Sequence, residues 1–303
     1  VNGHTHLPMS MFRGMADDLP LDVWLNDHIF PAEAREVNPE SVEKWSRLSC
    51  EEMLLAGTTT CCDGYFFESH AVRAMQDSGI RAVAGQGVID FPAPGVPDPS
   101  ENVRYASRYV ESLMDRESRV SPSIFCHSPY TCSKETLAAA KKAADRLGVL
   151  FQIHAAETKN EAQMIQGLNG QSIIRYLDDL GILDENTLLV HAVWVDDTDI
   201  QIIRDSGAGV VHCPESNMKL ASGISPVPRM IDAGIPVGLG TDGCASNNDL
   251  DLFSEMDTAA KLHKVALLDP CAMDAKTTLQ AATITGAKAV SLDRITGSIE
   301  KGK

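Results

Sequence analysis

The sequence alternates between strand-like and helix-like segments, and four of the strand-like segments end in residues that bind metals or transfer protons. These four segments are VNGHTH, FQIHAAET, TLLVHAVW and VGLGTDG. The alternation predicts parallel strands joined by crossover helices. Side chains from separate strands share one site only where the strands lie side by side and end at a common rim. Together these observations predict an α/β fold, a (β/α)8 TIM barrel.

The predicted strands account for a complete barrel. The first ends at His6, and the remaining seven are expected at residues 57–65, 81–90, 120–131, 149–158, 187–194, 207–216 and 236–244. Each is an apolar or β-branched run bounded by residues typical of turns. The Pro- and Gly-rich residues 91–99 (FPAPGVPDP) predict a long surface loop and no domain linker.

Three of the predicted helices have recognisable ends. Ser, Asn and Asp are favoured N-caps, because their side chains accept hydrogen bonds from the free N–H groups of the first turn. Gly is favoured after the last turn, where the backbone becomes left-handed. The predicted ends are Asn38 with Gly57, Ser133 before ETLAAAKKAADRLG, and Asp196 with Gly207.

Length, composition and charge exclude several classes of protein. The 303 residues suit one barrel domain spanning 1–303, and 44% hydrophobic with 22% charged residues is typical of a soluble globular protein. No apolar run reaches a membrane span of about 18 residues, and no signal peptide is visible, so a cytoplasmic location is expected. The net charge of −16 argues against nucleic acid or an anionic membrane as partner.

The cysteine pattern and the first residues of the chain give two further indications. The eight cysteines include no C-x-x-C pair, which argues against a disulfide framework and against a cysteine zinc site. The chain opens inside its first strand without an initiator Met. We therefore expect the sequence to be a barrel taken from a longer protein.

The ordered motifs HTH, HAAE, VHA, VVHCPESNMKLASG and GTDGCASNN resemble the amidohydrolase superfamily. Within it, they are similar to the branch of 5′-methylthioadenosine/S-adenosylhomocysteine deaminases and triazine hydrolases, over nearly the whole chain. The resemblance implies a small β-sandwich domain, made from chain ends that are missing from this sequence. It also implies metal-dependent hydrolytic deamination of 5′-methylthioadenosine, S-adenosylhomocysteine or adenosine to the inosine analogue plus ammonia.

The resemblance implies one divalent metal ion, with zinc favoured and Fe²⁺ or Mn²⁺ as alternatives. Alternate residues of a strand face the same side, so the two histidines of HTH can share an ion. The fourth strand ends in IFCHSPYT and lacks the lysine that bridges two metals in some relatives, which favours a single ion. The alternative is that these histidines are core residues. The implied ligands are His4, His6, His154 and Asp242.

The resemblance also assigns proton-transfer roles to three residues. Glu157 would protonate a ring nitrogen and then shuttle protons so that ammonia leaves. His191 would orient the attacking water, and Asp242 would both bind the ion and accept a proton from this water. The alternative for Glu157 is an N-cap on the following helix.

The substrate residues implied by the resemblance are Trp24, Glu33, His127, His154 and Ser246. Trp24 would pack on the base, and the Glu33 carboxylate would accept hydrogen bonds from the ribose hydroxyls. Alternatively, Trp24 is a core residue, Glu33 a solvated charge and His127 packed without function. Residues 91–99 contain no arginine for a homocysteine carboxylate.

Other functions stay open from the sequence alone. A triazine chlorohydrolase or aminohydrolase would use the same metal chemistry without Glu33, and a guanine-type base deaminase is a further alternative. A non-catalytic binding protein would not need the six residues His4, His6, His154, Glu157, His191 and Asp242. The signature H-x-E with P-C-x-x-C of cytidine-type deaminases does not occur. A homo-oligomer is left open.

Overall fold

The computed structural model describes residues 1–114 and 119–303. Its single sheet has eight parallel strands that pair in sequence order. The Asp242 backbone N–H donates to the His4 carbonyl at 3.0 Å, and this contact joins the end of the eighth strand to the first. The fold is therefore the predicted (β/α)8 TIM barrel. The strands are β1 Asn2–Thr5, β2 Thr60–Tyr65, β3 Arg81–Val88, β4 Val120–Cys126, β5 Phe151–Ala155, β6 Thr187–His191, β7 Gly209–His212 and β8 Val237–Leu239.

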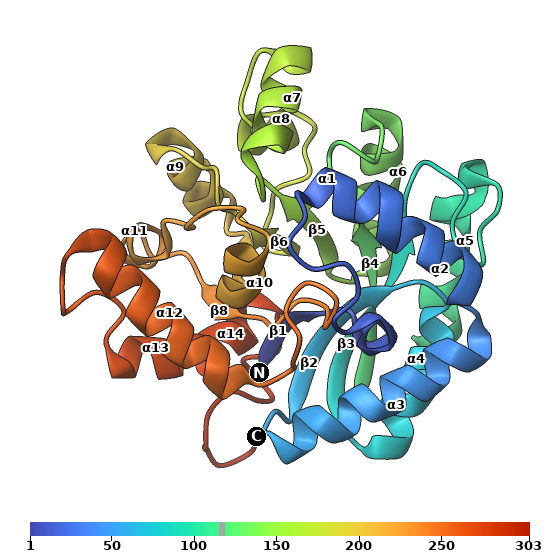
Figure 1. Cartoon of the computed structure of the whole chain (residues 1–303), viewed down its shortest axis with the longest axis horizontal. Coiled ribbons are helices and arrows are strands. Elements are labelled where there is room, and N and C mark those ends of the chain that lie inside the picture. Colours follow the sequence, from blue (N-terminus) through green and yellow to red (C-terminus); the bar gives the residue numbers. More distant parts are fainter. Residues whose placement is uncertain (115–118) are drawn as a thin grey trace.

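Helices surround the barrel, and both chain ends lie on the same side of the molecule (Figure 1). The α-helices are α1 Leu21–Val23, α2 Phe30–Glu36, α3 Pro39–Leu55, α4 Glu68–Ser78, α5 Asn102–Leu113, α6 Lys134–Leu147, α7 Lys159–Asn169, α8 Ile173–Asp179, α9 Asp197–Ser206, α10 Pro214–Lys219, α11 Val227–Asp232, α12 Leu252–Leu267, α13 Ala275–Ala281 and α14 Ile284–Ala289. Short 3₁₀ segments occupy η1 Leu7–Phe12 and η3 Pro99–Glu101, and a π-helical segment, η2, spans Trp24–Ile29.

The predicted helix ends are confirmed. Asn38 caps α3 in a capping box with Ser41, and Ser133 accepts from the first turn of α6. Asp196 caps α9, which ends at Gly207 in a left-handed conformation. These caps satisfy N–H groups that the helices leave free.

All eight predicted strands exist, but several predicted ends are wrong. The predicted strand 207–216 ends at His212 because Pro214 begins α10, and 120–131 ends at Cys126. The chain turns at residues with positive φ, namely Ala156 at 56° after β5, His191 at 76° as the last residue of β6, and Asp242 at 60° beyond β8. A left-handed residue cannot continue a strand. The last residues of these strands and the turns that follow them therefore carry the polar residues.

Inside the barrel, an apolar cluster fills the space below the polar strand ends. It includes Cys62, Val83, Leu188, Val190 and Val211, and residues at the end of α14 pack against it. Phe125 lies above, with its ring centroid 5.0 Å from that of His154. A Cβ at Gly64 would approach Phe125 to 2.6 Å, so the close approach of this ring requires glycine.

Residues 21–36 form a helical excursion between β1 and β2. It comprises α1, η2 and α2 in one continuous run, and Figure 1 shows it across the open face of the barrel. Its Phe30 ring lies 6.1 Å from the ring of His127, which follows β4. The excursion therefore covers the ends of the strands that carry the polar residues.

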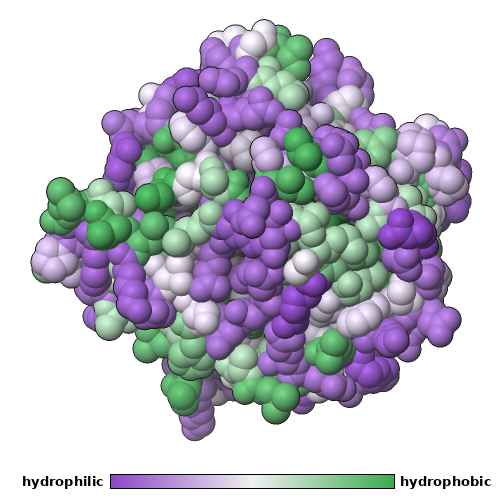
Figure 2. Space-filling view, in the orientation of Figure 1, coloured by the Kyte–Doolittle hydropathy of each residue, from purple (hydrophilic) through white to green (hydrophobic). Residues whose placement is uncertain are grey.

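The surface is mixed in character. Hydrophilic residues cover most of the face in Figure 2, with apolar residues in small groups between them. Within residues 1–114 and 119–303, no helix combines the length and the apolar character needed to cross a membrane.

Candidate active site

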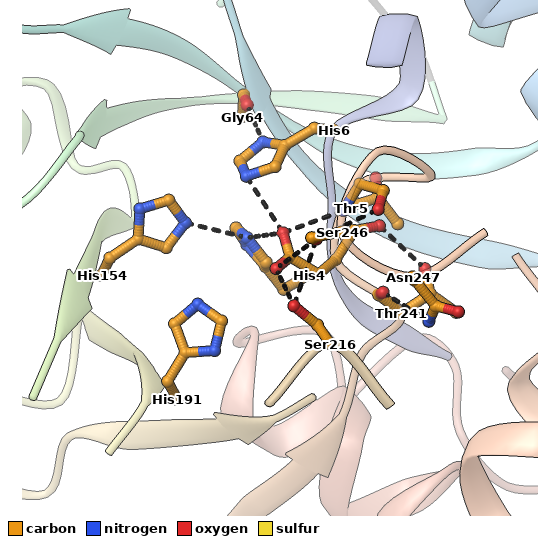
Figure 3. Close-up of polar contacts among 12 residues, drawn as sticks. His4, Thr5, His6, Gly64, His154, His191, Ser216, Thr241, Ser246 and Asn247 are labelled. Carbon is orange, nitrogen blue, oxygen red and sulfur yellow. Dashed lines mark hydrogen bonds and ion pairs between the residues drawn. The ribbon is translucent and has the colours of Figure 1, made fainter. Parts of the chain in front are cut away.

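Three imidazoles and one carboxylate converge at the carboxyl ends of β1, β5 and β8. Nε2 of His4 lies 3.2 Å from Nε2 of His154, and Nε2 of His6 lies 3.2 Å from Oδ1 of Asp242. One donor atom from each of the four residues lies within 4.8 Å of the others. Figure 3 shows these rings directed toward a common point, with His191 beside them. The structure thus brings together all four residues that the resemblance implied as ligands.

Neighbouring groups fix the orientation of these donors. The Gly64 carbonyl accepts from Nδ1 of His6 at 2.6 Å, which leaves Nε2 directed into the site. Ser216 and Ser246 donate to Oδ2 of Asp242 at 2.7 and 3.0 Å. Such outer hydrogen bonds hold metal-binding side chains in place. Ser246, which the resemblance implied as a substrate-binding residue, therefore also fixes the orientation of Asp242.

The charge states of His4, His154 and Asp242 suit a divalent cation, whereas burial of His6 is outweighed by its contacts with Asp242 and the Gly64 carbonyl, which raise its pKa. Burial lowers the pKa of His4 to about 4, and burial together with the neighbouring histidines lowers the pKa of His154 well below its usual value. Burial alone would raise the pKa of Asp242, but hydrogen bonds with His4 and His6 lower it well below the ordinary range. Unprotonated imidazoles and an ionised carboxylate are the ligands that divalent metals such as zinc require. The four residues could together hold a divalent metal ion.

Glu157 and His191 lie beside this cluster. Oε2 of Glu157 is 3.8 Å from Nε2 of His191, and burial raises the pKa of Glu157. Nδ1 of His191 donates to Oδ1 of Asn217 at 3.0 Å. This bond leaves the lone pair on Nε2, which faces Glu157. Both side chains can therefore hydrogen-bond a group that binds beside them.

The alternative interpretation of Glu157 as a helix N-cap is wrong. The N-cap of α7 is Thr158, whose hydroxyl oxygen accepts from the backbone N–H of Glu161 at 3.2 Å. The Glu157 side chain lines a pocket instead. The helix therefore does not need this carboxyl group.

An inner pocket joins the cluster to the excursion 21–36. Its lining includes Trp24, Glu33 and His127, so the structure brings the expected substrate residues to the same space as the metal donors. Glu33 is 5% exposed and accepts from the Tyr65 hydroxyl at 2.5 Å. Glu33 is thus buried and hydrogen-bonded, and the alternative of a solvated charge is wrong.

A larger outer chamber adjoins the inner pocket. The inner space has about 70 Å³ and the chamber about 800 Å³. Together they fall within the range of about 300–1,000 Å³ that is usual for small-molecule sites. The two spaces share the apolar wall residues Leu21, Leu25, Phe30, Tyr130 and Leu220.

Sequence reasoning missed three residues that support the site. Tyr65 ends β2 and donates to Glu33, Ser216 holds Asp242, and Asn217 holds His191. Tyr65 could have been found by the rule that strand ends carry the site in a barrel. Ser216 and Asn217 stand in the motif ESNMKLASG, which marked the region without revealing these partners.

Comparison with known proteins places this chain among metal-dependent hydrolases. The Amidohydrolase family model matches residues 1–303. A 5-methylthioadenosine/S-adenosylhomocysteine deaminase from Syntrophus aciditrophicus is 47% identical over 302 residues, which cover 100% of this chain and 68% of the relative. A 5′-deoxyadenosine deaminase from Methanothermobacter thermautotrophicus is 43% identical over 304 residues, covering 100% of this chain and 70% of the relative.

Solved structures agree with the barrel. The structure of an adenosine deaminase from Xanthomonas campestris with bound zinc superimposes with a TM-score of 0.96 at 40% identity, covering 99% of this chain and 68% of that one. An atrazine chlorohydrolase from Arthrobacter aurescens superimposes with a TM-score of 0.90 at 23% identity, covering 100% of this chain and 72% of that one, and so shares the fold. With a family model matched from end to end, and the metal-binding cluster of four residues at the rim of the barrel, this chain belongs to the amidohydrolase family.

Proposed function

We propose that this chain binds one zinc ion and catalyses the hydrolytic deamination of an adenosine-like nucleoside, with 5′-methylthioadenosine or S-adenosylhomocysteine favoured. As a member of its family, the chain is a hydrolase that acts on carbon–nitrogen bonds. The observation that carries the proposal is that Glu157 and Glu33 line the same pocket as the donor cluster. The names of the relatives at 43–47% identity support this substrate class.

The proposed ligands are His4, His6, His154 and Asp242. When bound, a divalent ion lowers the pKa of a water molecule to about 7 and so supplies hydroxide at neutral pH. Three imidazole nitrogens and one carboxylate oxygen suit zinc, and β4 ends at Cys126 with His127 beyond it and no lysine to bridge a second ion. One ion therefore fits the donor set.

The proton transfers are assigned to Glu157, His191 and Asp242. Deamination replaces the amino group of an electron-poor ring carbon with oxygen from water and releases ammonia. Glu157, whose pKa burial raises, donates its proton to the adjacent ring nitrogen and then carries a proton from the water to the leaving amine. Nε2 of His191 accepts a hydrogen bond from the attacking water, while the ionised Asp242 takes up its second proton, which returns to Glu157 as the products leave and restores both carboxyl groups.

The nucleoside is assigned to both spaces. The base occupies the inner pocket against Trp24 and His127, and Glu33 accepts hydrogen bonds from the ribose hydroxyls while Tyr65 holds its other oxygen. The 5′ substituent extends into the outer chamber. Residues of the excursion 21–36 form a wall of both spaces.

The test is ammonia release from a panel of purine nucleosides, free adenine, guanine, pterins and triazines. We expect the highest kcat/KM for adenosine-like nucleosides. Replacing Glu33→Ala should lower kcat/KM for 5′-methylthioadenosine by about 10- to 150-fold, because a charge-assisted hydrogen bond contributes about 1.5–3 kcal/mol. Free adenine, which lacks the ribose, should be affected little.

The same panel distinguishes the rival functions. Turnover confined to triazines, or a strong preference for guanine, would replace the nucleoside assignment with that of a triazine hydrolase or a base deaminase. An equal loss for every substrate in Glu33→Ala would show that Glu33 supports the pocket and does not bind ribose.

A further inference from the structure

Glu161 is a buried acid that the proposed chemistry does not use. It lies in the first turn of α7 and is 4% exposed. Its Oε2 accepts a hydrogen bond of 2.7 Å from the backbone N–H of Glu157. The side chain therefore binds the main chain of the residue proposed to carry the proton.

This contact differs from an ordinary helix cap. In a capping box, the acid at the third helical position reaches back to the backbone N–H of the N-cap residue. Here the N-cap is Thr158, and besides hydrogen bonds with the backbones of Thr158 and Ala156, Glu161 accepts from Glu157, the residue before the cap. The backbone N–H of Glu157 lies outside the helix, so this bond serves the turn between β5 and α7.

That turn has an unusual conformation. Ala156 has a φ of 56°, a left-handed geometry that costs a residue with a Cβ about 1–2 kcal/mol. Its carbonyl accepts from the backbone N–H groups of Val193 and Trp194 at 2.9 and 2.8 Å, so the loop after β6 holds one side of the turn. Glu161 holds the other side.

We propose that Glu161 is a positioning residue, which fixes the main chain of Glu157 so that the Glu157 carboxyl group faces His191 and the inner pocket. The inference rests on the proposed function, because it assumes that Glu157 transfers protons. The side chain of Thr158 caps the helix, so Glu161 is not its N-cap.

The burial of Glu161 supports a role beyond stability. Burial and the nearby charge of Glu157 raise the pKa of Glu161 to about 8. Burying a carboxyl group is unfavourable unless its hydrogen bonds compensate, and its Oε1 has no partner among the described residues. A glutamine retains an oxygen at this place that can accept from Glu157, whereas alanine does not.

The test compares Glu161→Ala, Glu161→Gln and Thr158→Ala, assayed as metal-loaded full-length protein on the most active nucleoside of the panel. We expect Glu161→Ala to lower kcat by about 10- to 100-fold, because misplacing a catalytic group by about 1 Å has this effect. KM and metal content should stay within about twofold of wild type. Glu161→Gln should restore kcat to within about threefold.

Thr158→Ala is the matched control, because it removes the cap of the same helix without touching the backbone N–H of Glu157. It should lower the Tm but leave kcat within about twofold, while KM can change because Thr158 also lines the outer chamber. An equal loss of kcat in Thr158→Ala and Glu161→Ala, or a Glu161→Ala variant with normal kcat, would overturn the inference. So would a Glu161→Gln variant as slow as Glu161→Ala.

The double variant Glu157→Gln/Glu161→Ala separates this inference from the proposed function. If Glu161 acts only through Glu157, the double variant should be no slower than Glu157→Gln alone. Additive losses would contradict positioning. A Glu157→Gln variant with normal turnover would instead refute the proton-transfer role itself.

Discussion

The interior of the barrel has two layers, and the burial of side chains is compensated differently in each. The rim layer, at the carboxyl ends of the strands, contains His4, His6, His154, Glu157, His191 and Asp242, all 8% exposed or less. The lower layer contains Cys62, Val83, Leu188, Val190 and Val211 and is apolar. Burial of apolar side chains lowers the free energy of the folded state, whereas buried polar side chains need hydrogen-bond or ion-pair partners to replace the lost water.

The backbone shows the same contrast. The lower layer has regular strand pairing, from Leu188 with Gly209 to Val190 with Val211. At the rim, His191 and Asp242 adopt positive φ values of 76° and 60°. Strained residues of this kind persist where the surrounding structure holds them, and they cluster at functional sites. The apolar packing of the lower layer stabilises the fold, and this stability compensates for the strained and buried polar residues of the rim layer.

The largest effect should follow from removing a rim carboxylate. Asp242→Asn keeps the size of the side chain but weakens metal binding and cannot accept the proton of water. We expect kcat to fall at least about 10⁴-fold, since both effects are lost. Elemental analysis should find close to one ion per chain in wild type and much less in the variant. Two tightly held ions in wild type, or none with activity intact, would contradict the one-metal proposal.

A smaller loss is expected for the proton carrier. Glu157→Gln removes the ionisable group and keeps most of the shape, so kcat should fall by about 10²- to 10⁴-fold. The metal content should stay at the wild-type level, which separates this variant from Asp242→Asn. Near-normal turnover would show that another residue of the rim moves the proton.

The next prediction concerns Asn217, which holds the ring of His191 and is not one of the six residues of the rim layer. Asn217→Ala removes the acceptor for Nδ1 of His191, which frees the ring to rotate or to change tautomer. Groups that orient metal-site histidines typically contribute about 10- to 100-fold, and we expect a kcat loss of this size. Comparable metal content in variant and wild type would locate the effect at His191. An unchanged kcat would mean that packing alone holds this ring.

The lower layer should affect stability and leave chemistry intact. Leu188→Ala creates a cavity at a fully buried site, so the free energy of unfolding should fall by about 2–5 kcal/mol. Denaturant unfolding measures this loss, while kcat at a temperature well below the Tm should stay within about twofold. A large fall in kcat of the folded variant would show that the two layers are coupled, and that the lower layer does not affect stability alone.

The sequence by itself determined the barrel and the metal-binding cluster. Alternating apolar runs and capped helices are local signals, and each run ended beside a residue such as His154 or Asp242. Because parallel strands of a closed barrel end at one rim, these residues had to meet. The motifs HTH, HAAE and GTDG, through their resemblance to the amidohydrolase family, implied the donors without knowledge of any distance.

Only the tertiary structure decided how the rim is held and covered. The contacts of Tyr65 with Glu33, Asn217 with His191 and Glu161 with the backbone of Glu157 depend on the paths of loops. The exact ends of the strands and the helical structure of residues 21–36 could likewise not be predicted from the sequence pattern. The physical reason is that periodicity reports which face of an element is buried, whereas left-handed turns and side-chain pairing arise from packing between segments distant in sequence.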